Sequence, residues 1–117
     1  MADSRLRAAQ NMWLATVRPD GRPHLIPIWF GVLDGKWYFV TGPESVKARN
    51  LQHNARVAMA LEDGSNPLVV EGVARPVTPS AEVVRLFKDK FDWDITTDGE
   101  YSAVYEVAVT KRVLGKD

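Results

Sequence analysis

Two Asp-Gly pairs, at residues 20–21 and 34–35, divide the first third of the chain into three short runs rich in apolar and aromatic residues. Asp-Gly favours the tight bend of a β-hairpin, because both residues tolerate the positive φ that such a bend requires. The sequence therefore predicts strands over residues 12–17, 24–32 and 36–41, which follow one another as an antiparallel meander. The first third of the chain is thus expected to form an antiparallel sheet, to which the later strands add.

Three further strands are predicted in the remainder of the chain, over residues 56–62, 68–77 and 101–114. Gly72 lies in the middle of the second of these, and an interior glycine often marks a bulge or a bend in a barrel strand. Residues 92–100 are mostly polar, apart from Trp93 and Ile95, and are predicted to form a loop.

Short helices are predicted beside these strands. Residues 1–11 would form the first helix, with Asp3 or Ser4 as its N-cap. Thr78 and Pro79 are typical of a helix start, with Thr78 as the N-cap and Pro79 at the first helical position. The helix that follows places an apolar stripe on one face, made of Val83, Val84, Phe87 and Phe91.

Six strands with short flanking helices indicate a mainly β (α+β) fold, a six-stranded antiparallel barrel. The sheet has to close or pair, because amphipathic strands in a chain with 45% apolar residues leave no stable open face. The length of 117 residues suits a single domain over residues 1–117.

Composition narrows the class of partner. Lys plus Arg equals Asp plus Glu, at 15 each, so the formal net charge is zero. This balance argues against a nucleic-acid partner, which usually requires an excess of basic residues. No apolar run is long enough to span a bilayer and no secretory signal is evident, so no membrane association is expected. The chain has no cysteine, which excludes disulfides and thiolate metal sites, and a cytoplasmic protein is expected.

The segment over residues 41–51 is the strongest candidate for a binding site. Thr41 and Glu44 have the spacing of a capping box and Pro43 is tolerated in a first helical turn, so a helix is predicted to start at Thr41. Free backbone N–H groups at that start, with Ser45 and Lys47 beside them, would bind a phosphate or another anion.

Arg49 or Asn50 would supply a further donor one turn later in the same segment. The spacing alone also fits an ordinary capped surface helix with solvated cations, because capping boxes are common.

Candidate catalytic side chains are lacking. His24 and His53 have no partner at metal-ligand spacing, so solvated or helix C-cap roles are expected for both and no metal site is predicted. No two carboxylates are paired by the sequence as acid and base, and no serine nucleophile motif occurs. An anion site without catalytic residues would be explained by a cofactor that carries its own chemistry.

The run of residues 27–30, Pro-Ile-Trp-Phe, is unusually aromatic for a strand. Pro27 cannot donate to a ladder, so it requires an edge or an irregular place. Core packing explains most strand aromatics, and the functional alternative is a wall against a planar ring. Strand alternation puts Trp29 on the face opposite Ile28 and Phe30, and we expect Trp29 to lie near the ring.

Taken together, the motifs resemble those of the pyridoxamine-phosphate-oxidase-like split β-barrel flavoproteins. The resemblance covers nearly the whole chain and depends on order and spacing rather than on one unique motif. The matching stretches are Leu14-Ala15-Thr16, residues 20–24 and 27–30, Tyr38-Phe39-Val40-Thr41, residues 45–51, Arg56-Val57, residues 71–74 and residues 109–114.

The resemblance implies a homodimer of split barrels with the cofactor bound at the subunit interface. By this likeness Ser45 and Lys47 hold the cofactor phosphate, Lys47 as its chief ligand, and Asn50 braces the same loop. The residues that would line an isoalloxazine or deazaflavin ring are Pro27, Ile28, Trp29 and Thr41.

The chain departs from the family at one point of this motif. FMN oxidases of the family often have Ser-Arg-Lys where this chain has Ser45-Val46-Lys47. One cation is lost, which leaves coenzyme F420, a deazaflavin, as a candidate beside FMN. The chain also lacks the C-terminal extension of true pyridoxamine-phosphate oxidases, which argues against that substrate.

We therefore expect a small FMN- or F420-dependent oxidoreductase that transfers hydride between the cofactor and an organic small-molecule substrate, with no catalytic side chain of its own. One alternative is a non-catalytic binder or sensor of a flavin, haem or similar planar ligand. A second alternative is an interaction domain with an empty cleft.

Overall fold

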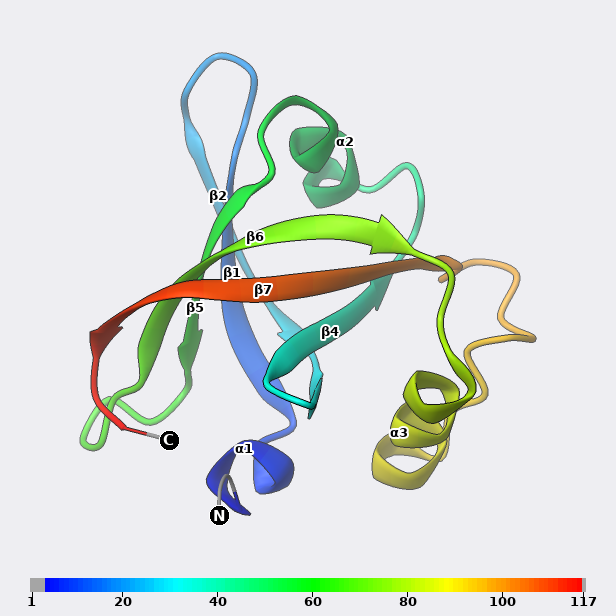
Figure 1. Cartoon of the computed structure of the whole chain (residues 1–117). Helices are drawn as coiled ribbons and strands as arrows, with labels where there is room; N and C mark the ends of the chain where they lie inside the picture. The colour runs from blue at the N-terminus through cyan, green and yellow to red at the C-terminus, as the bar shows by residue number, and fades with distance from the viewer. Residues whose placement is uncertain (1–3, 117) are drawn as a thin grey trace.

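The computed structural model describes residues 4–116, which form one strongly curled sheet with helices around it (Figure 1). Asp3, one of the two residues expected to cap the first helix, lies outside the described residues. The elements in chain order are α1 (Ser4–Ala8), β1 (Asn11–Val17), β2 (Pro23–Trp29), β3 (Gly31–Leu33), β4 (Lys36–Thr41), α2 (Val46–His53), β5 (Arg56–Leu61), β6 (Val69–Val77), α3 (Ala81–Phe91) and β7 (Ala103–Leu114).

The sheet is antiparallel throughout, in the order β2-β1-β5-β6-β7-β4-β3. β2 and β3 stand at the two ends of this order, yet Phe30 alone separates them in the chain. The sheet therefore has to curl until its two edges approach each other, which is the geometry of a split barrel. The predicted mainly β antiparallel class is confirmed.

The predicted strand over residues 24–32 is wrong in one respect, because the structure divides it and the sheet has seven strands instead of six. At Phe30 the chain stops pairing with β1 and starts pairing with β4. The Phe30 N–H donates to the Gln10 carbonyl at 3.2 Å, and its buried ring stacks on Trp37 with centroids 4.9 Å apart. The expected continuous meander is therefore two separate hairpins.

Both Asp-Gly bends are confirmed. Asp34 and Gly35 have φ values of 52° and 79°, the two consecutive positive angles of a two-residue hairpin turn. In the other bend Gly21 has φ of 92°, and the Arg18 N–H donates to the Arg22 carbonyl at 2.9 Å. Gly72 also lies at the predicted bulge, since the β6–β7 register shifts between Glu71 and Gly72.

Two helices begin later than expected. α2 is capped by Ser45, whose Oγ accepts from the Ala48 N–H at 3.2 Å, and not by Thr41. The chain first makes a tight turn in which the Ser45 N–H donates to the Gly42 carbonyl at 3.1 Å, so the helical path starts only after it. α3 is likewise capped by Ser80, which accepts from the Val83 N–H at 3.2 Å, and not by Thr78.

The first helix is also shorter than expected, because α1 ends at Ala8 and β1 already begins at Asn11. α1 contributes the buried Leu6 to the interior of the barrel. No helix in residues 4–116 is long and apolar enough to cross a membrane.

The apolar residues form two clusters on opposite sides of the sheet. The larger one fills the interior of the barrel and includes the fully buried Met12, Leu14 and Phe39. The smaller one lies outside the barrel, where α3 covers β4 and β7. The predicted apolar stripe of α3 faces this second cluster, with Val83 and Phe87 buried and Val84 and Phe91 packed at its margin.

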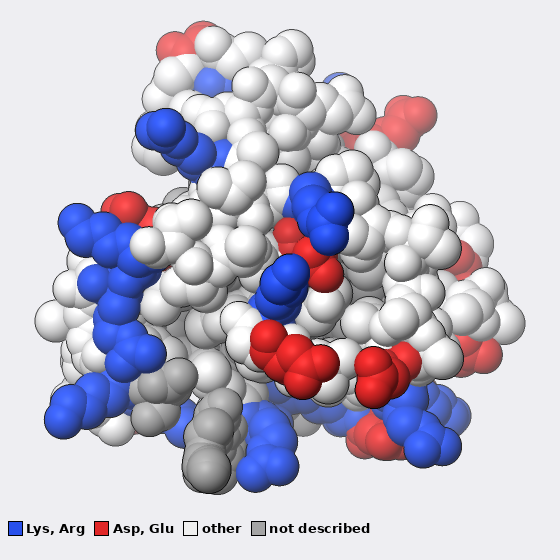
Figure 2. Space-filling view, in the orientation of Figure 1, with Lys and Arg blue, Asp and Glu red and all other residues white. Residues whose placement is uncertain are grey.

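Charged side chains of both signs are interspersed on the face shown in Figure 2, and basic groups gather over the C-terminal end of β7 at the left. Glu106 of β7 accepts from the Tyr38 hydroxyl and from the Arg75 guanidinium, each at 2.8 Å. The Tyr38 hydrogen bond and Arg75 lower the pKa of Glu106, so this carboxylate stays ionised and joins β4, β7 and β6.

Candidate functional site

A pocket of about 580 Å³ opens where the end of β2 approaches the end of β4, α2 and α3. We call it the ring pocket. Its lining residues are Pro27, Ile28, Trp29, Val40, Thr41, Lys47, Phe91, Asp92, Trp93, Asp98 and Tyr101. Residues of four separate elements and one loop therefore meet at the open seam of the barrel.

Five of the seven residues expected to form a cofactor site line this pocket, namely Pro27, Ile28, Trp29, Thr41 and Lys47. β2 is an edge strand, so Pro27 lies at a sheet edge, as its missing N–H requires. Trp29 is 45% exposed while Ile28 packs towards the core, so the predicted alternation along β2 is confirmed.

The pocket has an aromatic wall. The Trp29 ring stacks on Phe91 with centroids 4.4 Å apart and planes 5° from parallel. Trp93 meets Trp29 edge-on at 6.0 Å, and Tyr101 meets Trp93 edge-on at 6.3 Å. Four aromatic rings from β2, α3 and the following loop thus offer flat apolar surface to a planar ligand.

Lys47 is the cation of this pocket. It lies in the first turn of α2, where it is half-buried, and its ammonium makes no hydrogen bond or ion pair with any residue that the structure describes. Burial lowers the pKa of Lys47, because the charged ammonium has lost part of its hydration. A half-buried cation without a partner is stabilised when an anion binds beside it.

Ser45 does not line the pocket. Its Oγ accepts from the Ala48 N–H at 3.2 Å and from the Thr41 hydroxyl at 3.1 Å, and Thr41 does line the pocket. The Ser45 hydroxyl therefore contacts the pocket only through Thr41, and it fixes the turn that leads into α2. Its own proton remains free for donation to an acceptor.

Asn50 lies on another side of α2. It is buried, and its Nδ2 donates to the Thr16 Oγ1 at 3.0 Å. The helix thus turns the Asn50 amide towards β1, and its role beside Ser45 stays a prediction. Asn50 fastens α2 to the barrel and so fixes the orientation of Lys47.

The end of α3 and the loop after it supply residues that the sequence did not reveal as part of a site, namely Phe91, Trp93, Asp98 and Tyr101. Asp98 accepts from the Glu100 and Tyr101 N–H groups at 2.9 Å and from the Trp93 indole at 3.0 Å. These bonds lower the pKa of Asp98, with the Tyr101 N–H as the largest cause. Asp98 therefore acts as an ionised brace that orients the wall. The available signal was two aromatic residues in an otherwise polar loop.

Neither histidine lines the ring pocket. His53 is exposed at the end of α2, in agreement with the sequence. His24 is partly exposed, but its Nδ1 is buried and has no hydrogen-bond partner among the described residues. Within residues 4–116, no group of three His, Asp or Glu side chains is placed to hold a metal ion.

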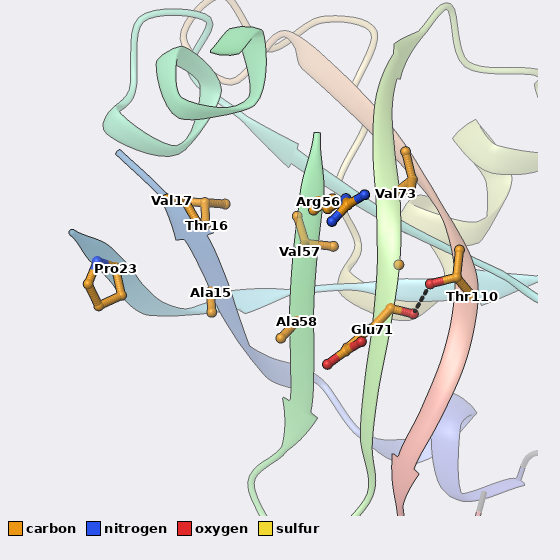
Figure 3. A pocket seen from close by; sticks show the side chains of 11 residues that line it. Ala15, Thr16, Val17, Pro23, Arg56, Val57, Ala58, Glu71, Val73 and Thr110 are labelled. Atoms are coloured by element: carbon orange, nitrogen blue, oxygen red, sulfur yellow. Dashed lines mark hydrogen bonds between the residues drawn. The ribbon is translucent and has the colours of Figure 1, made fainter. Parts of the chain in front are cut away.

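A second hollow of similar size, about 590 Å³, lies on the outer face of β1, β5 and β6 (Figure 3). Figure 3 shows Ala15, Ala58 and Val73 along it, with Arg56 and Glu71 as its charged groups. It contains no residue of the predicted anion site and no aromatic ring. Lys47 and the stacked aromatic rings line the ring pocket instead.

Solved structures with the same fold include proteins of different function. An F420 reductase is 26% identical, with 97% of this chain and 98% of that chain covered and a TM-score of 0.75. HutZ, the heme storage protein from Vibrio cholerae, is 19% identical, with 94% and 92% covered and a TM-score of 0.76. A putative pyridoxamine 5'-phosphate oxidase from Listeria innocua is 22% identical, with 92% and 90% covered and a TM-score of 0.72.

No curated protein sequence matches the chain at a significant level. The family model described as pyridoxamine 5'-phosphate oxidase matches residues 2–112, which is almost the full length. The curled antiparallel sheet and the structural neighbours agree with that match. The chain belongs to the pyridoxamine 5'-phosphate oxidase family.

Proposed function

We propose that this protein binds FMN or coenzyme F420 in the ring pocket and transfers hydride between that cofactor and a small organic substrate. The observation that carries the proposal is Lys47, a half-buried cation without a partner for its ammonium among residues 4–116, beside a wall of aromatic rings. A planar ring that carries a phosphate on a flexible chain would satisfy both features.

The residues of the chain have distinct tasks in this proposal. Lys47 binds the phosphate, and the first backbone N–H groups of α2 add their partial positive charge. Trp29 covers the ring and excludes water, while the Asp98 brace holds Trp93 in place. The bound isoalloxazine or deazaflavin supplies the hydride chemistry, so no side-chain acid or base is required.

The choice between the two cofactors depends on the charge around the phosphate. Val46 stands where FMN oxidases of the family often have Arg, and it is exposed at the first position of α2. Among the residues that the structure describes, Lys47 is then the one cation that lines the pocket. The F420 reductase among the structural neighbours supports the deazaflavin as a candidate beside FMN.

A non-catalytic role in binding haem or another planar ligand is the second candidate. The structural similarity to a heme storage protein favours it. Haem iron is usually held by an axial His, Cys, Met or Tyr, and of these residue types the ring pocket contains Tyr101 alone. A haem titration of wild type and Tyr101→Phe tests this candidate, because loss of the iron–ligand absorbance band in the variant would support it.

We also propose that the protein is a homodimer. The outer face of β2, β1, β5 and β6 is apolar and carries the exposed Leu25, Trp13 and Val73. Pro27 and Trp29 continue this face to the edge of the ring pocket, so a second copy packed there would reach the site. In a two-fold interface Arg56 and Glu71 can pair with each other across the axis.

A cofactor titration tests the proposed function. A charge-assisted contact contributes roughly 1.5–3 kcal/mol, so Lys47→Ala should weaken binding of FMN or F420 by about ten- to a hundredfold. Arg49→Ala, two residues along the same helix, should leave the affinity within about threefold for FMN. Thermal melts of both apo variants should match the wild type within about 0.5 kcal/mol.

The absorbance spectrum and mass of any copurified small molecule would identify the cofactor directly. Equal affinity of wild type and Lys47→Ala would contradict the assigned anion contact. Saturable binding of neither cofactor at micromolar concentration would contradict the proposed function as a whole.

A further inference from the structure

A separate hollow of about 360 Å³ lies between the β1–β2 turn and the outer side of α2. We call it the arginine pocket. Its lining residues include Arg18 and Arg22 from the turn and Arg49 and His53 from α2. An α-helix advances about 100° per residue, so Arg49 points away from Lys47 and from the ring pocket.

The arginine pocket has an excess of positive charge in a chain whose net charge is zero. Asp20 is the one carboxylate among its lining residues, and it is already paired with the Arg22 Nε at 2.7 Å. One guanidinium N–H of Arg18 donates to the Pro23 carbonyl at 2.6 Å, and the other N–H groups of this guanidinium can still bind a ligand. The Arg49 backbone N–H donates to the Ser45 carbonyl at 3.0 Å, but its guanidinium makes no hydrogen bond or ion pair with a described residue.

Both walls of this pocket are held in place. On one side the turn is closed by the Arg18 N–H to the Arg22 carbonyl at 2.9 Å and by the Gly21 N–H to the Arg18 carbonyl at 2.8 Å. On the other side Asn50 ties α2 to Thr16 and Leu51 is buried in the barrel. The backbone on both sides of the pocket is therefore fixed before any ligand arrives, so a ligand has only the arginine side chains to order.

His24 of β2 lies close to cations that line both pockets. His24 of β2 has a buried Nδ1 without a partner among the described residues. Burial lowers the pKa of His24, and the nearby charges of Arg18 and Lys47 lower it further. His24 thus lies within the electrostatic reach of a cation from each pocket.

We propose that the arginine pocket is a second anion-binding site, for a group with clustered negative oxygens such as a phosphate or an oligocarboxylate. Guanidinium groups match such oxygens with paired hydrogen bonds, and three of them converge on one hollow here. This site does not depend on Lys47 or on the identity of the ring-pocket ligand.

The anion has two possible sources, a free ligand or the distal part of a cofactor whose phosphate binds Lys47. FMN has a single phosphate group, whereas F420 continues beyond its phosphate into a chain with carboxylates. A second anion site on the other side of α2 would therefore distinguish the two cofactors.

Inorganic pyrophosphate titrated into the apo protein by calorimetry, at constant ionic strength, tests the site. Arg49→Glu should weaken pyrophosphate binding by about ten- to a hundredfold, because it replaces one donor with a like charge. The matched control Arg85→Glu makes the same change on the exposed surface of α3 and should leave the affinity within about threefold. Lys47→Ala should also leave it within about threefold.

Two results would overturn the proposal. One is wild-type affinity in Arg49→Glu when its thermal melt shows a folded protein, and the other is loss of binding in Lys47→Ala alone, which would place the anion in the ring pocket. Absence of saturable binding by the wild type up to millimolar pyrophosphate would also overturn it.

A competition experiment separates the two sources. Displacement of pyrophosphate by F420 but not by FMN would support the site as the holder of the cofactor's distal anions. Displacement by neither would support a free anion as its ligand. Failure of both cofactors to bind the ring pocket, with pyrophosphate binding retained, would contradict the proposed function and leave the second site standing.

Discussion

The outer surface of the curled sheet has two halves, and within residues 4–116 a helix covers only one of them. Over β4 and β7 the apolar side chains Tyr38, Val40 and Val104 are covered by α3. Over β2, β1, β5 and β6 many side chains are also apolar, yet Leu25 and Val73 remain exposed. The same sheet thus buries one outer half within the chain and leaves the other half bare.

The ring pocket lies at the boundary between the two halves. Trp29 belongs to the bare half, and its stacking partner Phe91 belongs to the helix that covers the other half. The difference indicates that the covered half stabilises the fold, whereas the bare half is available for another molecule. Substitutions in each half should therefore change different measured quantities.

The largest effect is expected in the covered half. Phe87 of α3 is fully buried against the sheet, so Phe87→Ala should lower the free energy of unfolding by about 3–5 kcal/mol through lost contacts and a residual cavity. Chemical denaturation of wild type and variant measures this change. Because the contact lies within one chain, the loss should not depend on protein concentration, and a concentration-dependent loss would contradict the assignment of this half.

The next effect is expected in the bare half. Val73→Glu places a carboxylate opposite Arg56 on the neighbouring strand, so the single chain should still fold. In a two-fold interface the same change puts two charges into apolar surface and should raise the dimer dissociation constant by about a hundredfold, or roughly 3 kcal/mol.

Sedimentation over a range of concentrations measures that change. Such an interface is expected to bury on the order of 2,000 Å² or more. Ala81→Glu is the matched control, because it adds the same charge to exposed α3 surface in the other half. A wild type that sediments as a stable monomer at micromolar concentration would contradict the proposed dimer.

Much of the fold followed from local sequence. The two Asp-Gly bends and the bulge at Gly72 have backbone requirements that a single residue type reveals. The apolar stripe of α3 was visible because helical periodicity marks its buried face whatever that face packs against.

The break at Phe30 was not visible in the sequence, because apolar residues continue on both sides of it and only the change of pairing partner divides the strand. The start of α2 was missed for a similar reason. Thr41 and Ser45 are both competent caps, and the tertiary turn between them decides which one serves.

The candidate site was predicted only in part. Residues close together in sequence, such as Pro27, Ile28 and Trp29, could be grouped by their motif. Phe91 and Tyr101 join them through the path of the loop after α3, which no short-range pattern encodes. The arginine pocket depends likewise on a turn and a helix that are distant in sequence.

A smaller effect is expected at the ring pocket, in the quenching of tryptophan fluorescence by a bound cofactor. Bound flavin should quench Trp29, so Trp29→Phe should remove the largest share of the cofactor-dependent quench. Trp93 also lines the ring pocket, and Trp93→Phe should remove a lesser share. Trp37→Phe is the control, because Trp37 is buried in the barrel against Phe30. An unchanged quench in Trp29→Phe would place the ring away from the boundary.

The smallest effect concerns Lys90 of α3, whose ammonium lies 4.5 Å from the Phe30 ring centre and 5.5 Å from that of Phe91. Burial lowers its pKa from 10.5 to about 8, while the aromatic faces favour the charged form and oppose this change. Between pH 8 and 10.5 the unfolded chain should therefore bind more protons at this residue than the folded chain does. Stability contributed by Lys90 should accordingly rise with pH over that window and be flat below it.

The measurement compares wild type with Lys90→Met, which keeps the apolar stem and loses the charge. The difference in unfolding free energy should shift in favour of the wild type by less than about 1 kcal/mol between pH 8 and 9.5, since Lys90 is only half-buried. Lys88→Met is the matched control, because Asp92 raises the pKa of Lys88 and places its titration above this range. A difference that does not change with pH would mean that the two aromatic rings keep Lys90 fully charged in the folded protein. The pKa of Lys90 would then be the same in the folded and the unfolded chain.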